Sequence, residues 1–300
     1  CLETCPVPQA LAVSGNTGEI SLNEHACLFF KDRSCRACVE ACPEGAVNLD
    51  DAPRTIEVKS DAVVLAAGFT AFDPKEKPRF GYGWTPGVMT ALELDSMLRK
   101  DGFNPGDGDN AVNSVAFIQC VGSRDAKIGR NYCSQVCCGY ALRLARVLRS
   151  RYPRIEPAMF YMDIQTFDRD FERRLEEAAR EVRLIRAMPA EVRSAPDGRP
   201  EVSYTGPDDK TVFESFDLVV LSVGMSPDSG LGRLAEIFGV GTDQDGFLGS
   251  DGHAVSTEST GVFVAGAVQG PKSIEEAVSH AMSTAGRVAS YLKTRGGENP

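Results

Sequence analysis

The sequence lacks several features that would assign it to a class at once. No apolar run approaches about 18 residues, the length a membrane-spanning helix needs, and no block of Lys and Arg offers the basic face that nucleic acid requires. The formal net charge is −10. Histidine is scarce: His25, His253 and His280 show no metal-ligand spacing, and we expect His280 at a solvent-facing helix position. These absences favour a protein that binds small cofactors or protein partners, and no nucleic acid.

Cysteine, in contrast, is abundant, with ten among 300 residues. A chain of this length is far larger than a disulfide-stapled secreted domain, and no signal peptide is visible, so the spacings favour metal ligation. The sequence begins at Cys1, without an initiator Met and already inside a cysteine pattern. We therefore expect the true N-terminus to lie upstream.

The first 50 residues carry six of the cysteines. "CRACVEACPEGAV" has the spacing C-x2-C-x3-C-P, and "CLETCP" repeats its ending. In two-cluster ferredoxins the cysteine before Pro ligates the other cluster. This rule predicts one [4Fe–4S] cluster on Cys5, Cys27, Cys35 and Cys38, and a second that uses Cys1, Cys42 and two ligands upstream of Cys1. A zinc site remains the alternative, because C-x2-C also suits tetrahedral zinc.

Strand-like apolar runs alternate with helical periodicity after residue 60, which predicts a doubly wound α/β fold. Ser134 is the expected N-cap of a helix over 135–152. The predicted strands are 61–69, 113–120, 157–164 and 261–265, with antiparallel strands and a return strand within 200–205 and 211–224. A long C-terminal helix is expected to bury one apolar face, formed by Ile274, Ala277, Val278, Ala281, Ala285, Val288 and Leu292.

A third group of cysteines, Cys120, Cys133, Cys137 and Cys138, has the spacing C-x12-C-x3-C-C and follows the strand "VAFIQC". A nicotinamide domain would carry G-x-G-x-x-G there, and this chain has "CVGSRD". Cys137 and Cys138 fall in the first turn of the expected helix, whose positive end favours thiolates. These residues are predicted to hold a metal cluster; a redox disulfide or buried structural thiols are the alternatives.

Two small-residue turns, in "AVVLAAGF" and "GVFVAGAVQGPKSIEEA", follow apolar strands on either side of this unit. Such turns let backbone N–H groups and a helix N-terminus approach an anionic or carbonyl-rich ligand. Either glycine, Gly68 or Gly266, could equally cap a buried strand. Their order matches flavoprotein reductases in which a nicotinamide domain interrupts the FAD domain.

Five segments carry a specific resemblance to one known family: "FIQCVGSRD", "YCSQVCCGYAL", "VVLAAGF", "FGYGWTPGVMTALELD" and "GVFVAGAVQGPKSIEEAV". From about Cys1 to Leu292 the chain resembles the flavin and iron–sulfur subunit of heterodisulfide reductase and its bacterial relatives. The resemblance implies a thioredoxin-reductase-like FAD domain interrupted by a Rossmann-like domain, with a ferredoxin-like insert. The corresponding expected boundaries are 1–55 for the insert, 56–111 and 229–300 for the FAD domain, and 112–228 for the Rossmann-like domain.

The resemblance also implies site residues. It places a [4Fe–4S] cluster on Cys120, Cys133, Cys137 and Cys138, and FAD along Ala67, Gly68, Gly266, Ala267, Gln269, Lys272 and Ile274. Glu93 is a candidate contact of the flavin ring. Arg143 stands where the family usually has Lys, and Arg does not readily release a proton. No G-x-G-x-x-G for FAD is present, and many flavin reductases have an acid where this chain has Ala267.

The function that the resemblance implies is electron transfer. FAD and [4Fe–4S] clusters would relay or bifurcate electrons to other subunits of a cytoplasmic redox complex, namely disulfide-reducing, hydrogenase or dehydrogenase subunits and ferredoxin, with a dimer inside the complex. Two alternatives stay open: an NAD(P)H-dependent flavin disulfide reductase that uses Cys137 and Cys138 as a redox dithiol, and a zinc-stapled binding module.

Overall fold

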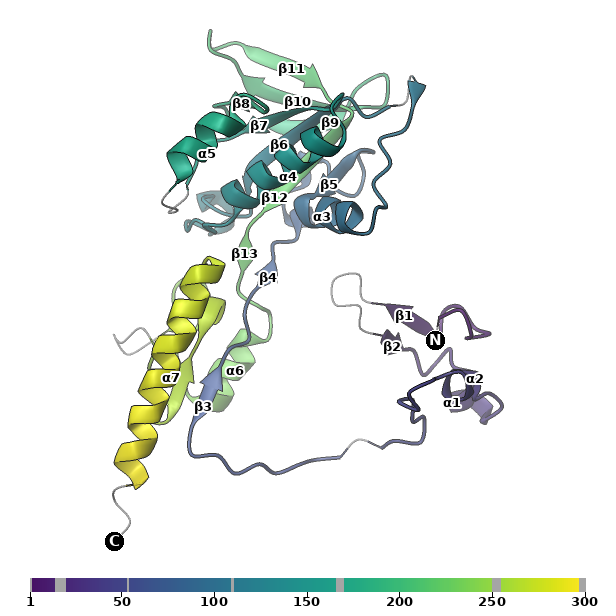
Figure 1. The fold of residues 1–300 in the computed structure, drawn as a ribbon, viewed down its shortest axis with the longest axis vertical. Helices are drawn as coiled ribbons and strands as arrows, with labels where there is room; N and C mark the ends of the chain where they lie inside the picture. The colour runs from purple at the N-terminus through teal and green to yellow at the C-terminus, as the bar shows by residue number, and fades with distance from the viewer. Residues whose placement is uncertain are drawn as a thin grey trace. The chain divides into compact units, whose positions relative to one another are not determined.

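The structure is a computed structural model that describes residues 2–13, 20–52, 54–108, 111–165, 170–249 and 255–296. The chain divides into two compact units, Cys1–Lys59 and Ser60–Pro300 (Figure 1). The expected insert, 1–55, ends close to this division, and the boundaries expected inside the second unit stay predictions.

The first unit has few regular elements and a small core. Strand β1 (Leu11–Val13) pairs antiparallel with β2 (Ile20–Leu22), and two short helices follow, α1 (Leu28–Asp32) and α2 (Ala37–Glu40). Phe29 is fully buried, with the guanidinium of Arg33 4.3 Å from its ring centroid. Few other apolar side chains in this unit are buried. A core this small needs an additional staple, such as bound metal, to fold stably.

A five-stranded parallel sheet forms the centre of the second unit (Figure 1). Its strands, in spatial order, are β5 (Val88–Thr90), β12 (Leu218–Val223), β6 (Ser114–Val121), β7 (Glu156–Phe160) and β8 (Arg183–Ile185). Strand β6 is buried over nearly its whole length, as parallel strands covered on both faces are. One apolar core lies between the sheet and three helices, α3 (Ala91–Arg99), α4 (Cys137–Arg151) and α5 (Phe171–Ala178).

The opposite face of the sheet is covered by strands, which differs from the doubly wound expectation of helices on both faces. Strands β9 (Glu191–Ser194), β10 (Pro200–Thr205) and β11 (Thr211–Ser215) form an antiparallel sheet. Phe160 of β7 packs against Tyr204 of β10, with ring centroids 4.9 Å apart. The antiparallel strands expected at 200–205 and after 211 are thus confirmed, but they replace a helical layer.

Segments before and after the central sheet meet in a separate part of this unit. Strand β3 (Val63–Leu65) pairs parallel with β14 (Val262–Val264), and β4 (Thr70–Ala71) pairs antiparallel with β13 (Met225–Ser226). The expected strand 61–69 is therefore only three residues long. Helix α6 (Leu231–Phe238) and helix α7 (Ile274–Gly296) complete this part. Among the described residues, 3-10 helices connect elements of the unit at Pro74–Glu76, Pro78–Phe80, Ala126–Ile128 and Gly266–Gln269.

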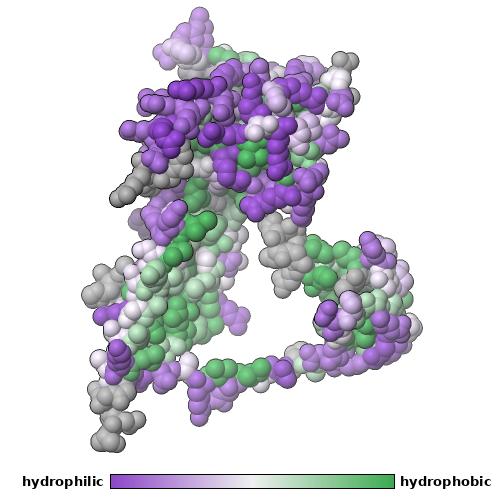
Figure 2. Space-filling model, in the orientation of Figure 1, coloured by the Kyte–Doolittle hydropathy of each residue, from purple (hydrophilic) through white to green (hydrophobic). Residues whose placement is uncertain are grey.

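Helix α7 buries a different face from the one expected. Ile274, Val278 and Met282 are 83%, 55% and 72% exposed, and Figure 2 shows apolar residues along the helix surface. The packed side includes Thr284, which is 1% exposed and donates a hydrogen bond to the carbonyl of Val264 at 2.9 Å. No helix in the described part of the chain combines the length and the apolar character that a membrane crossing requires.

Candidate functional site

Strand β6 delivers Cys120 to the carboxyl edge of the central sheet. Cys120 is 7% exposed and has φ of 57°, a left-handed conformation that is costly for any residue with a Cβ. Arg124 and Gln135, which lie in the loop to the next helix, have φ of 53° and 62°. Such backbone strain costs about 1–3 kcal/mol per residue and concentrates at functional sites. The strained residues therefore mark this loop as a candidate site.

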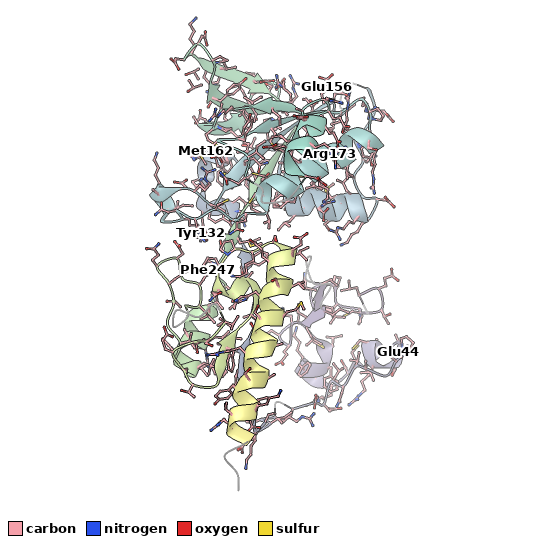
Figure 3. All side chains as sticks on the ribbon, turned by 60° about the vertical axis from the view of Figure 1, so that its left-hand side comes forward. Glu44, Tyr132, Glu156, Met162, Arg173 and Phe247 are labelled. Atoms are coloured by element: carbon pink, nitrogen blue, oxygen red, sulfur yellow. The ribbon has the colours of Figure 1, made fainter. Side chains whose placement is uncertain are left out.

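Hydrogen bonds attach the loop from Cys120 to Cys133 to strand β13. The Tyr132 hydroxyl donates to the carbonyl of Met225 at 2.9 Å, and its ring packs edge-on against Phe247 at 5.5 Å. Figure 3 shows Tyr132 and Phe247 next to each other. Ser134 accepts a hydrogen bond from the Met225 N–H at 2.8 Å. These contacts hold the loop in place on both sides of Cys133.

Helix α4 begins at Cys137, with Val136 rather than the expected Ser134 at the N-cap position. The Ser134 hydroxyl is taken by Met225 and by Ser123, whose oxygen is 3.2 Å away. Cys137 and Cys138 nevertheless occupy the first turn of the helix, as predicted. Their backbone N–H groups lie at its positive end, which stabilises nearby negative charge.

The four sulfur atoms act on one another. Burial, followed by repulsion from Cys138 and Cys133, raises the pKa of the Cys120 thiol to about 11. Burial and the other three cysteines also raise the pKa of Cys137, and burial followed by Cys133 raises that of Cys138. All four are free thiols. Without a metal the buried three are neutral at pH 7, so metal ligation must displace their protons.

The donor set fits an iron–sulfur cluster in its chemistry. Four thiol groups from a strand end, a loop and a helix start are the ligands that a [4Fe–4S] cluster takes. Among the residues that the structure describes, no three His, Cys, Asp or Glu side chains already stand in the geometry of a metal site. The cluster on these cysteines therefore stays a prediction, with its ligands gathered at one edge of the sheet.

The first unit has a pocket that four of its cysteines line. Cys5, Cys27, Cys35 and Cys38 share it with apolar side chains, namely Pro6, Val7, Ala10, Leu11, Leu22, Leu28 and Leu49. These are the four cysteines that the C-P rule assigns to one cluster. Four thiols in an apolar surround suit such a cluster, because the protein shell excludes water from it.

Cys42 is not among the residues that line this pocket. Its sulfur accepts a hydrogen bond from the Ala46 N–H at 3.3 Å, and backbone N–H donors, that of Ala46 first, lower the pKa of this thiol. This separation agrees with the assignment of Cys42 to a second cluster. Its expected companion Cys1 lies outside the described residues.

The two turns predicted to contact FAD lie at the same edge of the small parallel sheet. Ala67 and Gly68 follow β3, and the 3-10 turn Gly266–Gln269, which includes Ala267, follows its parallel neighbour β14. Gly266 has φ of 73°, and a Cβ added there would meet no heavy atom within 4 Å. Open space beside a turn at the carboxyl end of parallel strands fits a dinucleotide.

His280 corrects the expectation that it faces solvent. It is half-buried, and its Nδ1 accepts the Gly266 N–H at 2.9 Å, so it fixes the turn after β14. Lys272 is half-buried after the same turn, and burial lowers its pKa. Ile274 is largely exposed at the start of α7. The flavin contacts of Gln269, Lys272 and Ile274 stay predictions.

Glu93 and Arg143 are not paired with each other. Glu93 completes a capping box for α3: its Oε2 accepts the Thr90 N–H at 2.6 Å and its Oε1 accepts the Tyr82 hydroxyl at 2.9 Å. Arg143 is exposed and donates to Asp95 at 2.7 Å. The capping box accounts for Glu93 without a flavin, and both flavin-linked roles stay predictions.

Two groups beside the four cysteines could not be found from the sequence pattern. The Tyr140 hydroxyl donates to the carbonyl of Val223 at 2.6 Å, the same oxygen that faces the Cys137 sulfur at 3.6 Å. Arg124 forms a bidentate ion pair with Asp163. "CVGSRD" contains the arginine, but no sequence signal links it to Asp163 in the loop after β7.

Comparison with known proteins gives a family. The pyridine nucleotide-disulphide oxidoreductase family matches residues 32–284. This chain belongs to that family. It is therefore an oxidoreductase, built on the α/β fold of that family, as expected in outline. The crystal structure of sulfide:quinone oxidoreductase from the hyperthermophilic bacterium Aquifex aeolicus shares the fold, with a TM-score of 0.51, 15% identity, and 79% of this chain and 56% of that chain covered.

Curated relatives confirm the resemblance to heterodisulfide reductase. The A-subunit of the H(2):CoB-CoM heterodisulfide,ferredoxin reductase of Methanothermobacter thermautotrophicus is 36% identical over 300 residues, which are 95% of this chain and 43% of that protein. The iron-sulfur subunit of the CoB--CoM heterodisulfide reductase of Methanocaldococcus jannaschii is 36% identical over 272 residues, 85% of this chain and 41% of that protein. The chain thus spans less than half the length of these relatives.

Proposed function

We propose that the protein is the flavin and iron–sulfur subunit of a heterodisulfide-reductase-like complex. It relays or bifurcates electrons between FAD and [4Fe–4S] clusters and passes them to partner subunits. Bound FAD exchanges one or two electrons and each cluster exchanges one. Cys120, Cys133, Cys137 and Cys138 hold one cluster, and up to two more lie in the first unit.

The observation that carries this proposal is the position of the four thiols. Cys120 lies at the carboxyl end of the central parallel strand β6, and Cys137 and Cys138 lie in the first turn of α4, where an oxidoreductase of this fold would bind a nicotinamide. The backbone there has no glycine-rich cradle for a pyrophosphate. Thiols and a helix N-terminus suit an anionic thiolate cluster instead.

The burial of these cysteines argues against the dithiol alternative. A redox dithiol reacts through an accessible thiolate of low pKa. Cys137 and Cys138 are 6% and 5% exposed, and burial raises the pKa of both. Such thiols are poor nucleophiles but serve well as enclosed ligands.

The names of the relatives support the partners in this proposal. Because those names mention ferredoxin and hydrogen, we propose disulfide-reducing, hydrogenase or dehydrogenase subunits and ferredoxin as partners of this chain. We further propose a cytoplasmic complex in which the chain forms a dimer. FAD would lie along the turns after β3 and β14.

Metal and flavin analysis of the anaerobically purified full-length protein tests the proposal. We expect flavin, and iron with sulfide in the ratio of four-iron clusters. Cys137→Ser should remove about four iron atoms per chain, whereas Arg193→Gln, in an ion pair with Glu201 on the β9–β10 ladder, should remove none. Stoichiometric zinc without a chromophore, or nicotinamide oxidation without iron, would overturn the proposal.

A further inference from the structure

Arg124 is held between two of the four cysteines. It follows Cys120 by four residues, and its backbone N–H donates to the carbonyl of Tyr132, the neighbour of Cys133, at 2.9 Å. Its left-handed conformation, φ 53°, is one that few arginines adopt. Its guanidinium acts electrostatically on both Cys120 and Cys133. The loop is thus built to present a fixed positive charge beside these two sulfurs.

Asp163 approaches the same group from the neighbouring strand. It comes three residues after β7, directly after Met162, which Figure 3 labels and whose carbonyl accepts a hydrogen bond from Arg186 at 3.2 Å. The Asp163 carboxylate is one of the charges that, after burial and Cys133, raise the pKa of the Cys138 thiol.

The two charges form a bidentate pair. They act in opposite directions on the neighbouring thiols: Arg124 opposes the rise that burial causes in the pKa of Cys120 and Cys138, and Asp163 adds to that rise. The Arg124 and Asp163 side chains are 26% and 42% exposed, so water screens them only in part. Lys77 is another cation that acts on Cys120, and its own partner, Asp125, lies 2.6 Å away.

We propose that Arg124 and Asp163 form an electrostatic pair that sets the reduction potential of the cluster on the four cysteines. The inference rests on the proposed function. When the cluster takes one electron, from the flavin or from dithionite, cluster and thiolates together become more negative by one charge. The guanidinium stabilises the added charge and the carboxylate opposes it, and charges near a cluster are known determinants of its potential. Both residues are positioning groups and neither carries the electron.

Redox titration of the full-length protein, followed by EPR, tests this. The signal of this cluster is the one that Cys137→Ser removes. In Arg124→Gln the ratio of reduced to oxidised cluster at a fixed potential should fall about tenfold, a shift of about −59 mV for one electron. Asp163→Asn should raise the ratio, and the double variant should return toward wild type.

Two variants serve as controls. Arg124→Lys keeps the charge and should stay near the wild-type potential. Arg193→Gln removes the same charge from an ion pair with Glu201, 2.8 Å, on the β9–β10 ladder, and should cause no shift. If Arg124→Gln does not retain iron, Asp163→Asn alone tests the inference. A higher ratio of reduced to oxidised cluster in that variant would support the inference, and a lower or unchanged one would overturn it. Bound iron with unchanged potentials in both variants would overturn this inference alone. If the wild-type protein lacks the iron that Cys137→Ser is expected to remove, the proposed function is overturned as well.

Discussion

Gly122, two residues after Cys120, should tolerate no side chain. Its φ is 83°, and a Cβ there would lie 2.5 Å from Cδ2 of Phe72 and overlap the ring. Phe72 is 2% exposed, and the guanidinium of Arg130 lies 5.1 Å from its ring centroid, so the ring has little room to move. The left-handed conformation costs Ala about 1–2 kcal/mol and overpacking about 1–3 kcal/mol more. Gly122→Ala should therefore lose about 2–5 kcal/mol of unfolding free energy.

Gly129→Ala is the matched control for this change. Gly129 lies in the same loop with φ of 70°, but a Cβ there would meet nothing within 4 Å. It should lose only the conformational cost of about 1–2 kcal/mol. Chemical denaturation followed by circular dichroism compares the two variants, and iron analysis should show cluster loss in Gly122→Ala alone. Equal destabilisation of both variants would refute the packing argument.

Three further predictions concern separate parts of the chain. Asp125→Asn leaves the buried Lys77 unpaired and should cost about 3 kcal/mol at pH 7. Lys77 lowers the pKa of Asp125 in the folded protein. The extra unfolding free energy of the wild type is therefore fully present above the pKa that Asp125 has in the unfolded chain, and it is lost as pH falls through the lower folded pKa. The denaturation curves of wild type and variant should converge below about pH 4. Glu93→Ala breaks the capping box with Thr90 and should cost about 1 kcal/mol in thermal or chemical unfolding while flavin content stays unchanged; flavin loss would restore its flavin role. Cys27→Ser should remove about four iron atoms without touching the EPR signal that Cys137→Ser removes; loss of that signal would contradict separate clusters.

Local spacing indicated which four cysteines of the first unit line one pocket, and their ligation of a cluster stays a prediction. Ligands of one cluster in a small unit come from short loops, so the C-P rule picks out Cys5, Cys27, Cys35 and Cys38, the same four cysteines that line one pocket of the fold. Helix periodicity likewise predicted that Cys137 and Cys138 lie in the first turn of α4. These features depend on residues close together in the sequence.

Features that depend on tertiary contacts were missed. Ser134 has the side chain of an N-cap, but its hydroxyl accepts the Met225 N–H, 91 residues away. The expected apolar face of α7 was wrong because apolar residues occur around the helix, and packing against β14 selected the face with Thr284 and His280. The Arg124–Asp163 pair joins residues 39 apart. Periodicity and spacing contain no information on such pairs.

The start of α7 does have a local signal in the sequence. Helix α7 begins with Ser273 and Glu276 in mutual hydrogen bonds, the Ser N–H donating to the carboxylate at 2.7 Å and the Glu N–H to the hydroxyl at 3.1 Å. The S-x-x-E pattern predicts this start. The helix N-terminus beside the turn after β14 could therefore have been located from the sequence.

The proposed function depends on iron bound between β6 and α4. A crystal structure of the anaerobic full-length protein, with anomalous difference maps measured at the iron edge, would show whether iron is there. We expect one compact iron peak enclosed by the sulfurs of Cys120, Cys133, Cys137 and Cys138. A lone zinc ion, a Cys137–Cys138 disulfide or a bound nicotinamide at that position would contradict the proposed function.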